Sequence, residues 1–134
     1  MQKRVLAVND ISCVGRCSLT VALPVLSAAG IETSVLPTAI LSTHTGGFDG
    51  YTFRDLTNDI TPIVQHIKSL GRVYDGIFTG YLGSFSQLSE VTGLIRELKT
   101  ENCLVTVDPV MADNGEYYSF FSDEFARGMA LLCR

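Results

Sequence analysis

The sequence has few basic residues and few prolines, and these shortages exclude two classes of protein. Its 10 Lys and Arg residues face 14 acidic residues, form no cluster or stripe, and leave a net charge of −4. Recognition of a nucleic-acid backbone therefore has little support, and we expect no nucleic-acid partner. Only four prolines in a chain that is 46% hydrophobic and 18% charged exclude a disordered protein.

Signals for export and for membrane insertion are also lacking. The N-terminal segment reaches an acidic residue, Asp10, too early for a signal peptide. No apolar stretch approaches the length that spans a bilayer, and the apolar segment 21–30 is interrupted by Pro24. We therefore expect a soluble, cytoplasmic protein that does not associate with membranes.

The four cysteines and two histidines show no spacing typical of a metal site. Cys13 and Cys17 lie four residues apart and could share one face of a helical turn. Neither His44 nor His66 stands at a ligand-like spacing from them. Reduced thiols that pack as small apolar side chains are the simpler interpretation. His66 falls within a predicted helix, and we expect no role for it.

What recurs along the chain is a short apolar run, a polar or glycine-rich turn, and a stretch with helical periodicity. The apolar runs are 5–8, 33–41 (interrupted by Pro37), 76–79 and 104–107. The predicted helices begin at Ser18, at Thr61-Pro62, at Ser84 with Gln87 in capping-box spacing, and at Ser122. Apolar strands that alternate with helices are typical of a parallel sheet covered on both faces. The pattern predicts one α/β domain over residues 1–134, with a doubly wound, mainly parallel sheet.

Polar side chains follow each of the four predicted strands. In open parallel sheets, ligands bind beyond the carboxyl ends of the strands. The polar residues expected at this edge are Asp10 after the first strand, Ser42, Thr43, His44 and Thr45 after the second, Tyr81 after the third, and Asp108 with Asp113 after the fourth. One such residue alone could merely cap a helix, but four loops together indicate a small-molecule site. The carboxylates there could hold a metal–phosphate group.

The common nucleotide and hydrolase motifs are absent. The sequence has no Gly-x-x-x-x-Gly-Lys-[Ser/Thr], and the segment 10–17 after the first strand carries one glycine instead of Gly-x-Gly-x-x-Gly. Dinucleotide binding of the dehydrogenase type is thus disfavoured. Gly-x-Ser-x-Gly is also missing, which argues against an α/β-hydrolase.

Three short segments at this edge carry a family resemblance. They are Ser42-Thr43-His44-Thr45-Gly46, Gly80-Tyr81-Leu82-Gly83-Ser84 and Asp108-Pro109-Val110-Met111. The first two resemble the Ser-x-His-Thr and Gly-Tyr-Leu-Gly segments of pyridoxal (vitamin B6) kinases. The third is similar to the Asp-Pro-Val-[Met/Leu] motif of vitamin kinases in the ribokinase superfamily. Asn114-Gly115 and Tyr118 continue it as in bacterial pyridoxamine or pyridoxal kinases.

This resemblance implies a ribokinase-like fold and a kinase that uses ATP and Mg²⁺. Its members transfer the γ-phosphoryl group of ATP to the 5′-hydroxyl of pyridoxal, pyridoxine or pyridoxamine. The resemblance implies the following roles: Asp10, His44, Thr45 and Tyr81 bind the substrate, Asp108 lies near the Mg²⁺, and Asp113 and Tyr118 lie near the nucleotide. Acidic, metal-holding groups beside the phosphates suit a reaction catalysed mainly by positioning and charge neutralisation. Members are commonly dimers, so a homodimer is expected.

Two features depart from the family. Asp10 stands where many members have a serine that touches the pyridine ring. The family's Gly-x-Gly-Asp motif, which carries the catalytic aspartate, does not occur in the chain, and Gly46-Gly47-Phe48-Asp49 lies in the pocket loop and is no substitute. The resemblance therefore covers the N-terminal, substrate-side part of the kinase, and we expect the catalytic residue beyond Arg134 of an apparently truncated chain.

Two other functions stay open at this point. A hydroxymethylpyrimidine kinase of thiamine synthesis shares the Asp-Pro-Val-Met signature, although His44, Thr45 and Tyr81 favour the pyridoxal branch. A non-catalytic half-domain that binds a small ligand or an oligomer partner would explain the missing catalytic motif.

Overall fold

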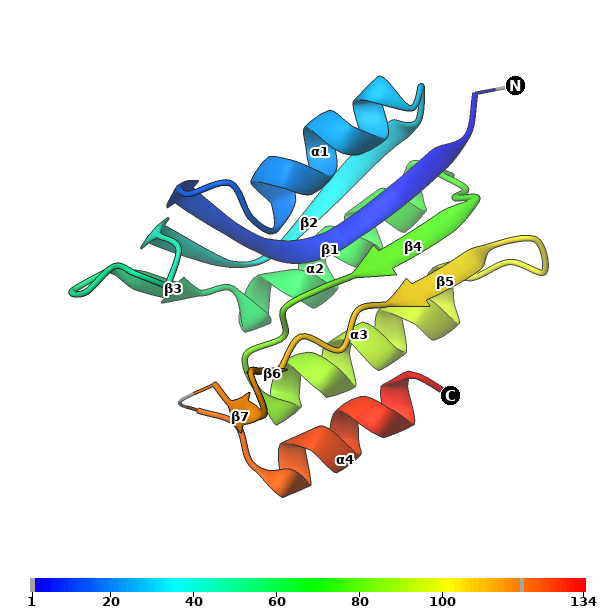
Figure 1. Cartoon of the computed structure of the whole chain (residues 1–134). Helices are drawn as coiled ribbons and strands as arrows, with labels where there is room; N and C mark the ends of the chain where they lie inside the picture. The colour runs from blue at the N-terminus through cyan, green and yellow to red at the C-terminus, as the bar shows by residue number, and fades with distance from the viewer. Residues whose placement is uncertain (1, 119) are drawn as a thin grey trace.

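β1 is the central strand of a five-stranded sheet (Figure 1). In the computed structural model, which describes residues 2–118 and 120–134, β1 (Arg4–Val14) pairs in parallel with β2 (Glu32–Thr43) and β4 (Gly76–Thr79). β5 (Leu104–Val107) pairs in parallel with β4, and β3 (Phe53–Asp55) runs antiparallel to β2. The order β3-β2-β1-β4-β5 confirms the predicted, mainly parallel α/β sheet.

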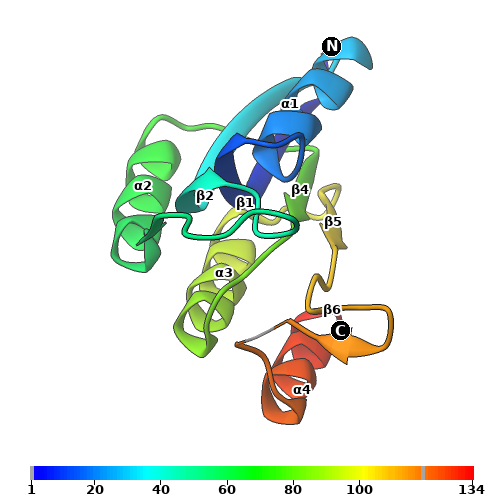
Figure 2. The same ribbon diagram turned by 60° about the vertical axis from the view of Figure 1, so that its left-hand side comes forward.

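Helices cover both faces of this sheet (Figures 1 and 2). α1 (Leu19–Ala28) packs on β1 and β2, whereas α2 (Thr57–Ser69), α3 (Phe85–Leu98) and α4 (Asp123–Leu132) lie on the opposite face. That second face holds the main core, to which the sheet contributes Leu6, Val8, Leu36 and Ile77 and the helices Ile60, Val64, Val91, Leu94, Phe125 and Met129. Over the described parts of the chain, no helix is long and apolar enough to cross a membrane.

The predicted starts of α3 and α4 are confirmed by side-chain caps. Ser84 Oγ accepts a hydrogen bond of 3.2 Å from the N–H of Gln87, and Ser122 Oγ accepts one of 3.3 Å from the N–H of Phe125. Such caps satisfy backbone donors that the first helical turn leaves without partners. Ser18 does occupy the N-cap of α1, but its side chain makes no capping hydrogen bond.

The start of α2 was predicted wrongly. The helix begins at Thr57, one turn before the predicted Thr61-Pro62 pair, and Pro62 lies inside it. The N-cap residue, Leu56, makes no side-chain capping bond, but Oδ1 of Asp55, at the end of β3, accepts the N–H of Thr57 at 2.8 Å. Because this bond comes from a strand that the sequence pattern does not show, Pro62 was the stronger local signal.

β1 and β2 are longer than predicted, and their pairing contains a β-bulge. The register shifts from Asn9↔Pro37 to Ile11↔Ile40, so two residues of β2 oppose Asp10 alone. β4 pairs with β1 only as far as Val8↔Thr79, so the continuation of β1 beyond Asn9 pairs with β2 only. Pro37, which lacks an N–H, lies at this irregularity, where proline is tolerated in a strand.

A short hairpin follows β5. β6 (Ala112–Asp113) and β7 (Glu116–Tyr117) pair antiparallel across Asn114 and Gly115, which have φ angles of 51° and 83°. Two positive φ angles in a two-residue loop are typical of a type I′ turn, which favours Asn-Gly. In the sequence, Asn114-Gly115 served only as part of a family motif, and no hairpin was predicted here.

Candidate functional site

Asp10 is a buried carboxylate at the point where β1 separates from β4. The residue is 5% exposed, and its Oδ2 accepts a hydrogen bond of 3.3 Å from Ser12 Oγ. It was expected to follow the first strand but lies within β1, opposite the bulge. Among the residues that the structure describes, no basic side chain forms an ion pair with it. A buried charge without a partner is unfavourable, so this position favours a ligand that brings a positive charge.

Tyr81, just after β4, interacts electrostatically with Asp10. Burial raises the pKa of the Tyr81 hydroxyl above its ordinary value of 10.0, and electrostatic interactions with Asp10, Tyr51 and Asp55 raise it further. The hydroxyl therefore stays protonated at physiological pH and can donate a hydrogen bond. Neither Tyr51 nor Asp55 was predicted as a site residue; they lie in the loop before β3 and in β3 itself.

The backbone of Tyr81 is held on both sides by buried side chains. Asn9 Oδ1 accepts the Tyr81 N–H at 2.9 Å, and Thr38 Oγ1 donates to the Tyr81 carbonyl at 3.2 Å. The ring lies 5.8 Å from that of Phe121, measured between centroids. Three elements, β1, β2 and the segment before α4, thus fix this tyrosine.

His44 and Thr45 lie farther along the β1–β2 extension. The N–H of His44 donates to the carbonyl of Val14 at 2.8 Å, and its ring Nδ1 accepts the N–H of Gly46 at 3.2 Å. Val14 is four residues beyond Asp10, which corresponds to roughly 13 Å along a strand. Both His44 and Thr45 are exposed. The structure thus places them at the same edge of the sheet as Asp10 but not against it.

The residues predicted to lie near the phosphates are all exposed. Asp108 follows β5, and its N–H donates to the Thr79 carbonyl at 2.9 Å. Asp113 Oδ1 accepts the N–H of Asn114 at 2.9 Å within the hairpin. The ring of Tyr118 lies 6.3 Å from Phe121, which also contacts Tyr81. An aromatic series thus connects the Tyr81 segment with the Tyr118 segment.

In the described part of the chain, the donors for a metal ion are incomplete. Across residues 2–118 and 120–134, no three His, Cys, Asp or Glu side chains gather in a way that could hold a metal ion. Asp108 alone therefore does not make a metal site, and a Mg²⁺ ion there would need further oxygen ligands, such as those of a bound phosphate.

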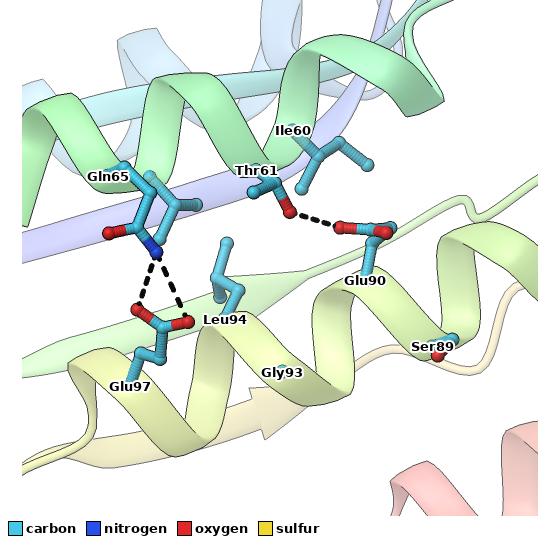
Figure 3. A pocket seen from close by; sticks show the side chains of 9 residues that line it. Ile60, Thr61, Gln65, Ser89, Glu90, Gly93, Leu94 and Glu97 are labelled. Carbon is cyan, nitrogen blue, oxygen red and sulfur yellow. Dashed lines mark hydrogen bonds between the residues drawn. The ribbon is translucent and has the colours of Figure 1, made fainter.

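A pocket of about 200 Å³ between α2 and α3 lies apart from all these residues (Figure 3). Its polar groups satisfy one another: Gln65 Nε2 donates to both carboxylate oxygens of Glu97, at 3.0 and 3.3 Å, and Thr61 donates to Glu90. None of the sequence-predicted site residues lines it. We therefore place the candidate site at the carboxyl edge of the sheet.

The geometry first defines a class: a mainly parallel α/β protein whose candidate site lies at the strand ends, around Asp10 and Tyr81. No family model matches the chain. Comparison with individual known proteins then narrows this class to the pyridoxal kinases. The "putative pyridoxal kinase" of Saccharomyces cerevisiae is 32% identical over 120 residues, which cover 87% of this chain and 38% of the yeast protein. The pyridoxal kinase of Dictyostelium discoideum is 29% identical over 123 residues, with 88% and 40% covered.

Solved structures give the same result at closer similarity. A "putative phosphomethylpyrimidine kinase" from Bacteroides thetaiotaomicron, crystallised with pyridoxal, is 41% identical with a TM-score of 0.93, over 98% of this chain and 46% of that one. The pyridoxal kinase of Lactobacillus plantarum is 32% identical with a TM-score of 0.90, over 98% and 47%. The chain is thus a relative of the pyridoxal kinases in sequence and in fold, and it spans less than half the length of these proteins.

Proposed function

We propose that this chain forms the substrate-binding part of an ATP- and Mg²⁺-dependent kinase that phosphorylates the 5′-hydroxyl of pyridoxal, pyridoxine or pyridoxamine. The observation that carries the proposal is the buried, unpaired carboxylate of Asp10 beside the protonated hydroxyl of Tyr81. B6 vitamers can supply the positive charge that Asp10 lacks, because their pyridine nitrogen can be protonated. Pyridoxamine adds an ammonium group.

Each predicted residue has a place in this proposal. Asp10 accepts a charge-assisted hydrogen bond from the vitamer, and Tyr81 packs on its ring or borders the path of the phosphate. His44 and Thr45 are proposed to contact the outer side of the bound vitamer. Asp108 is proposed to act on the Mg²⁺–phosphate group, and Asp113 and Tyr118 on the nucleotide. A cytoplasmic homodimer completes the proposal, on the family resemblance alone.

The part that this chain plays is binding and orientation. Phosphoryl transfer depends mainly on positioning and on neutralising the charge of the phosphates. The 134 residues contain no Gly-x-Gly-Asp, so we assign none of them the task of accepting the proton of the 5′-hydroxyl. We therefore expect the chain to bind a vitamer but not to phosphorylate it on its own.

The main alternative is a hydroxymethylpyrimidine kinase. The Bacteroides relative, named as a putative phosphomethylpyrimidine kinase, supports this alternative. That relative was nevertheless crystallised with pyridoxal, and the curated relatives are named as pyridoxal kinases. These findings support the B6 branch. A non-catalytic ligand-binding domain is the alternative from another class.

Calorimetric titration of the 134-residue chain separates these functions. Pyridoxamine and pyridoxine are better probes than pyridoxal, whose aldehyde also reacts with lysine side chains. We expect both to bind more tightly than hydroxymethylpyrimidine, and incubation with Mg-ATP to produce no phosphorylated vitamer above background. Tighter binding of the pyrimidine would favour the thiamine branch. Absence of any vitamer binding would contradict the proposal, and phosphorylation by the purified chain would overturn our division of roles.

A further inference from the structure

One buried side chain, Asn9, connects the two segments that form the centre of the candidate site. The residue is 6% exposed, and its Oδ1 accepts two backbone N–H groups. One belongs to Asp10, at 3.0 Å, and the other to Tyr81, at 2.9 Å. Asn9 and Tyr81 are 72 residues apart in the sequence. A single oxygen therefore sets the relative position of the Asp10 and Tyr81 backbones.

Gly80 gives this amide the space it needs. A Cβ atom at Gly80 would lie 2.1 Å from Nδ2 of Asn9, 2.5 Å from Cγ and 2.7 Å from Oδ1. Carbon cannot approach these atoms so closely, so any side chain at position 80 would displace the Asn9 amide. The requirement for glycine here is one of space. Asn9 and Gly80 are thus complementary across β1 and β4.

The N–H of Gly80 has its own acceptor, the carbonyl of Val8 at 2.9 Å. This bond extends the β1–β4 pairing by one residue. Just beyond it, where the backbone pairing ends, the side chain of Asn9 accepts the next N–H, that of Tyr81. Without the Asn9 oxygen, the N–H groups of Asp10 and Tyr81 would lose their acceptor next to a buried carboxylate. Both segments would then be free to shift.

We propose that Asn9 is a positioning residue: it holds the Asp10 carboxylate and the Tyr81 ring at the spacing that a B6 vitamer needs. The inference rests on the proposed function for its ligand, but the connection itself can be tested without any ligand. Asn9 contacts the two site residues through their backbones and so acts through them.

Amide hydrogen exchange tests the connection directly. In Asn9→Ala, the exchange of the Asp10 and Tyr81 amides should become about tenfold faster, as expected for the loss of roughly 1.4 kcal/mol. The Gly80 amide, bonded to Val8, is the internal control and should keep its rate. In Asn9→Asp, which retains an oxygen at this place, both amides should stay protected. Unchanged exchange of both amides in folded Asn9→Ala would overturn the proposal.

Gly80→Ala provides a second variant in case Asn9→Ala does not fold. It leaves Asn9 in the sequence but displaces its amide, so the Tyr81 and Asp10 amides should again exchange faster. Thr38→Val is the matched comparison, because it removes the bond to the Tyr81 carbonyl and leaves the Asp10 amide untouched. Equal effects of Thr38→Val and Gly80→Ala on the Asp10 amide would show general loosening and contradict a specific role of Asn9.

Binding of pyridoxamine tests the functional part. Asn9→Ala should weaken its affinity about tenfold in the folded protein, and Asn9→Asp should recover protection of the amides. Faster exchange with unchanged pyridoxamine affinity would show that Asn9 holds the backbone without positioning a ligand, and would overturn that role. If the unmodified chain binds no vitamer, the proposed function fails, whereas the exchange data still decide whether Asn9 connects the two segments.

Discussion

Nε2 of Gln87, in the first turn of α3, donates a hydrogen bond of 3.1 Å to Oδ2 of Asp55, the last residue of β3. The same nitrogen donates to the carbonyl of Thr38 at 2.9 Å, and Oε1 accepts the N–H of Gly83 at 2.8 Å. Gln87 is fully buried, so these bonds replace all contact of its amide with water. One side chain thereby joins α3 to β2, to β3 and to the loop that carries Tyr81.

Replacing Gln87 should therefore destabilise the fold. Gln87→Leu keeps much of the volume but leaves the partly buried Gly83 N–H without an acceptor and removes the donor to Asp55, whereas the Thr38 carbonyl keeps the Leu56 N–H at 3.0 Å. We expect a cost of about 2–3 kcal/mol in the free energy of unfolding. Gln65→Leu is the control, since Gln65 is exposed and should change stability by no more than about 0.5 kcal/mol. Urea denaturation measures both. Similar losses at the two positions would contradict the role of Gln87.

Removing the charge of Asp10 should weaken vitamer binding. Asp10→Asn keeps the shape of the side chain, and a hydrogen bond to a charged group contributes about 1.5–3 kcal/mol, so the affinity should fall by roughly one to two orders of magnitude. The loss should be larger for pyridoxamine than for pyridoxine if the ammonium group is the partner, and similar for both if it is the ring nitrogen. Asp59→Asn, at an exposed position in α2, is the control. Unchanged affinity of Asp10→Asn for both vitamers would remove Asp10 from the site.

Gly93→Ala should stabilise the protein. Gly93 lies within α3, and a Cβ there would meet no heavy atom within 4 Å. Alanine in a helix is favoured over glycine by about 0.5–1 kcal/mol, and the midpoint of urea unfolding should rise accordingly. Gly128→Ala in α4 is the matched comparison, because its Cβ would lie 3.0 Å from Cδ1 of Leu88. It should gain less or lose stability, and an equal gain at both positions would show that packing does not matter there.

Acid should weaken a group of ion pairs at the start of β1. Hydrogen bonds from Lys3 and from the Arg4 backbone lower the pKa of Asp75, and a hydrogen bond from Arg4 lowers that of Glu32. Because these pKa values are lower in the folded state, their contribution is present above the ordinary values of 3.8 and 4.5 and is lost as the pH falls through the folded-state values.

Thermal unfolding between pH 6 and pH 2.5 tests this behaviour. The melting temperature of Asp75→Asn should fall less on acidification than that of the unmodified protein, and Glu32→Gln should behave likewise. Both side chains are partly exposed, so the effects should be small and should shrink at high salt. Parallel curves for all three proteins would show that these pairs do not stabilise the fold.

The parts of the fold that the sequence predicted are those with local signals. β4 and β5 match apolar runs that end in polar residues, and Ser84 and Ser122 cap their helices as the spacing indicated. The same strand ends predict which edge of the sheet carries the candidate site.

The parts that were missed depend on contacts between distant segments. Asn9 and Asp10 look like the end of a strand because they are polar, yet both are buried within β1, next to a bulge in β2. β3 is three residues long, too short for a recognisable alternation, and it places the Asp55 carboxylate that bonds to the N–H of Thr57 and to Gln87. The Asn114-Gly115 signal was present, but strands of two residues give no pattern of their own.

The central place of β1 has a consequence for the rate at which the protein folds. Its first neighbour, β2, comes directly after α1, but its second, β4, begins beyond a segment that separates Arg4 from Asp75 by 71 residues. Parallel neighbours so far apart require the chain to lose much of its freedom before their hydrogen bonds form. We therefore expect β1, α1 and β2 to associate first, and the joining of β4 to limit the overall rate. Asp10 and Tyr81 would then meet only in that final step.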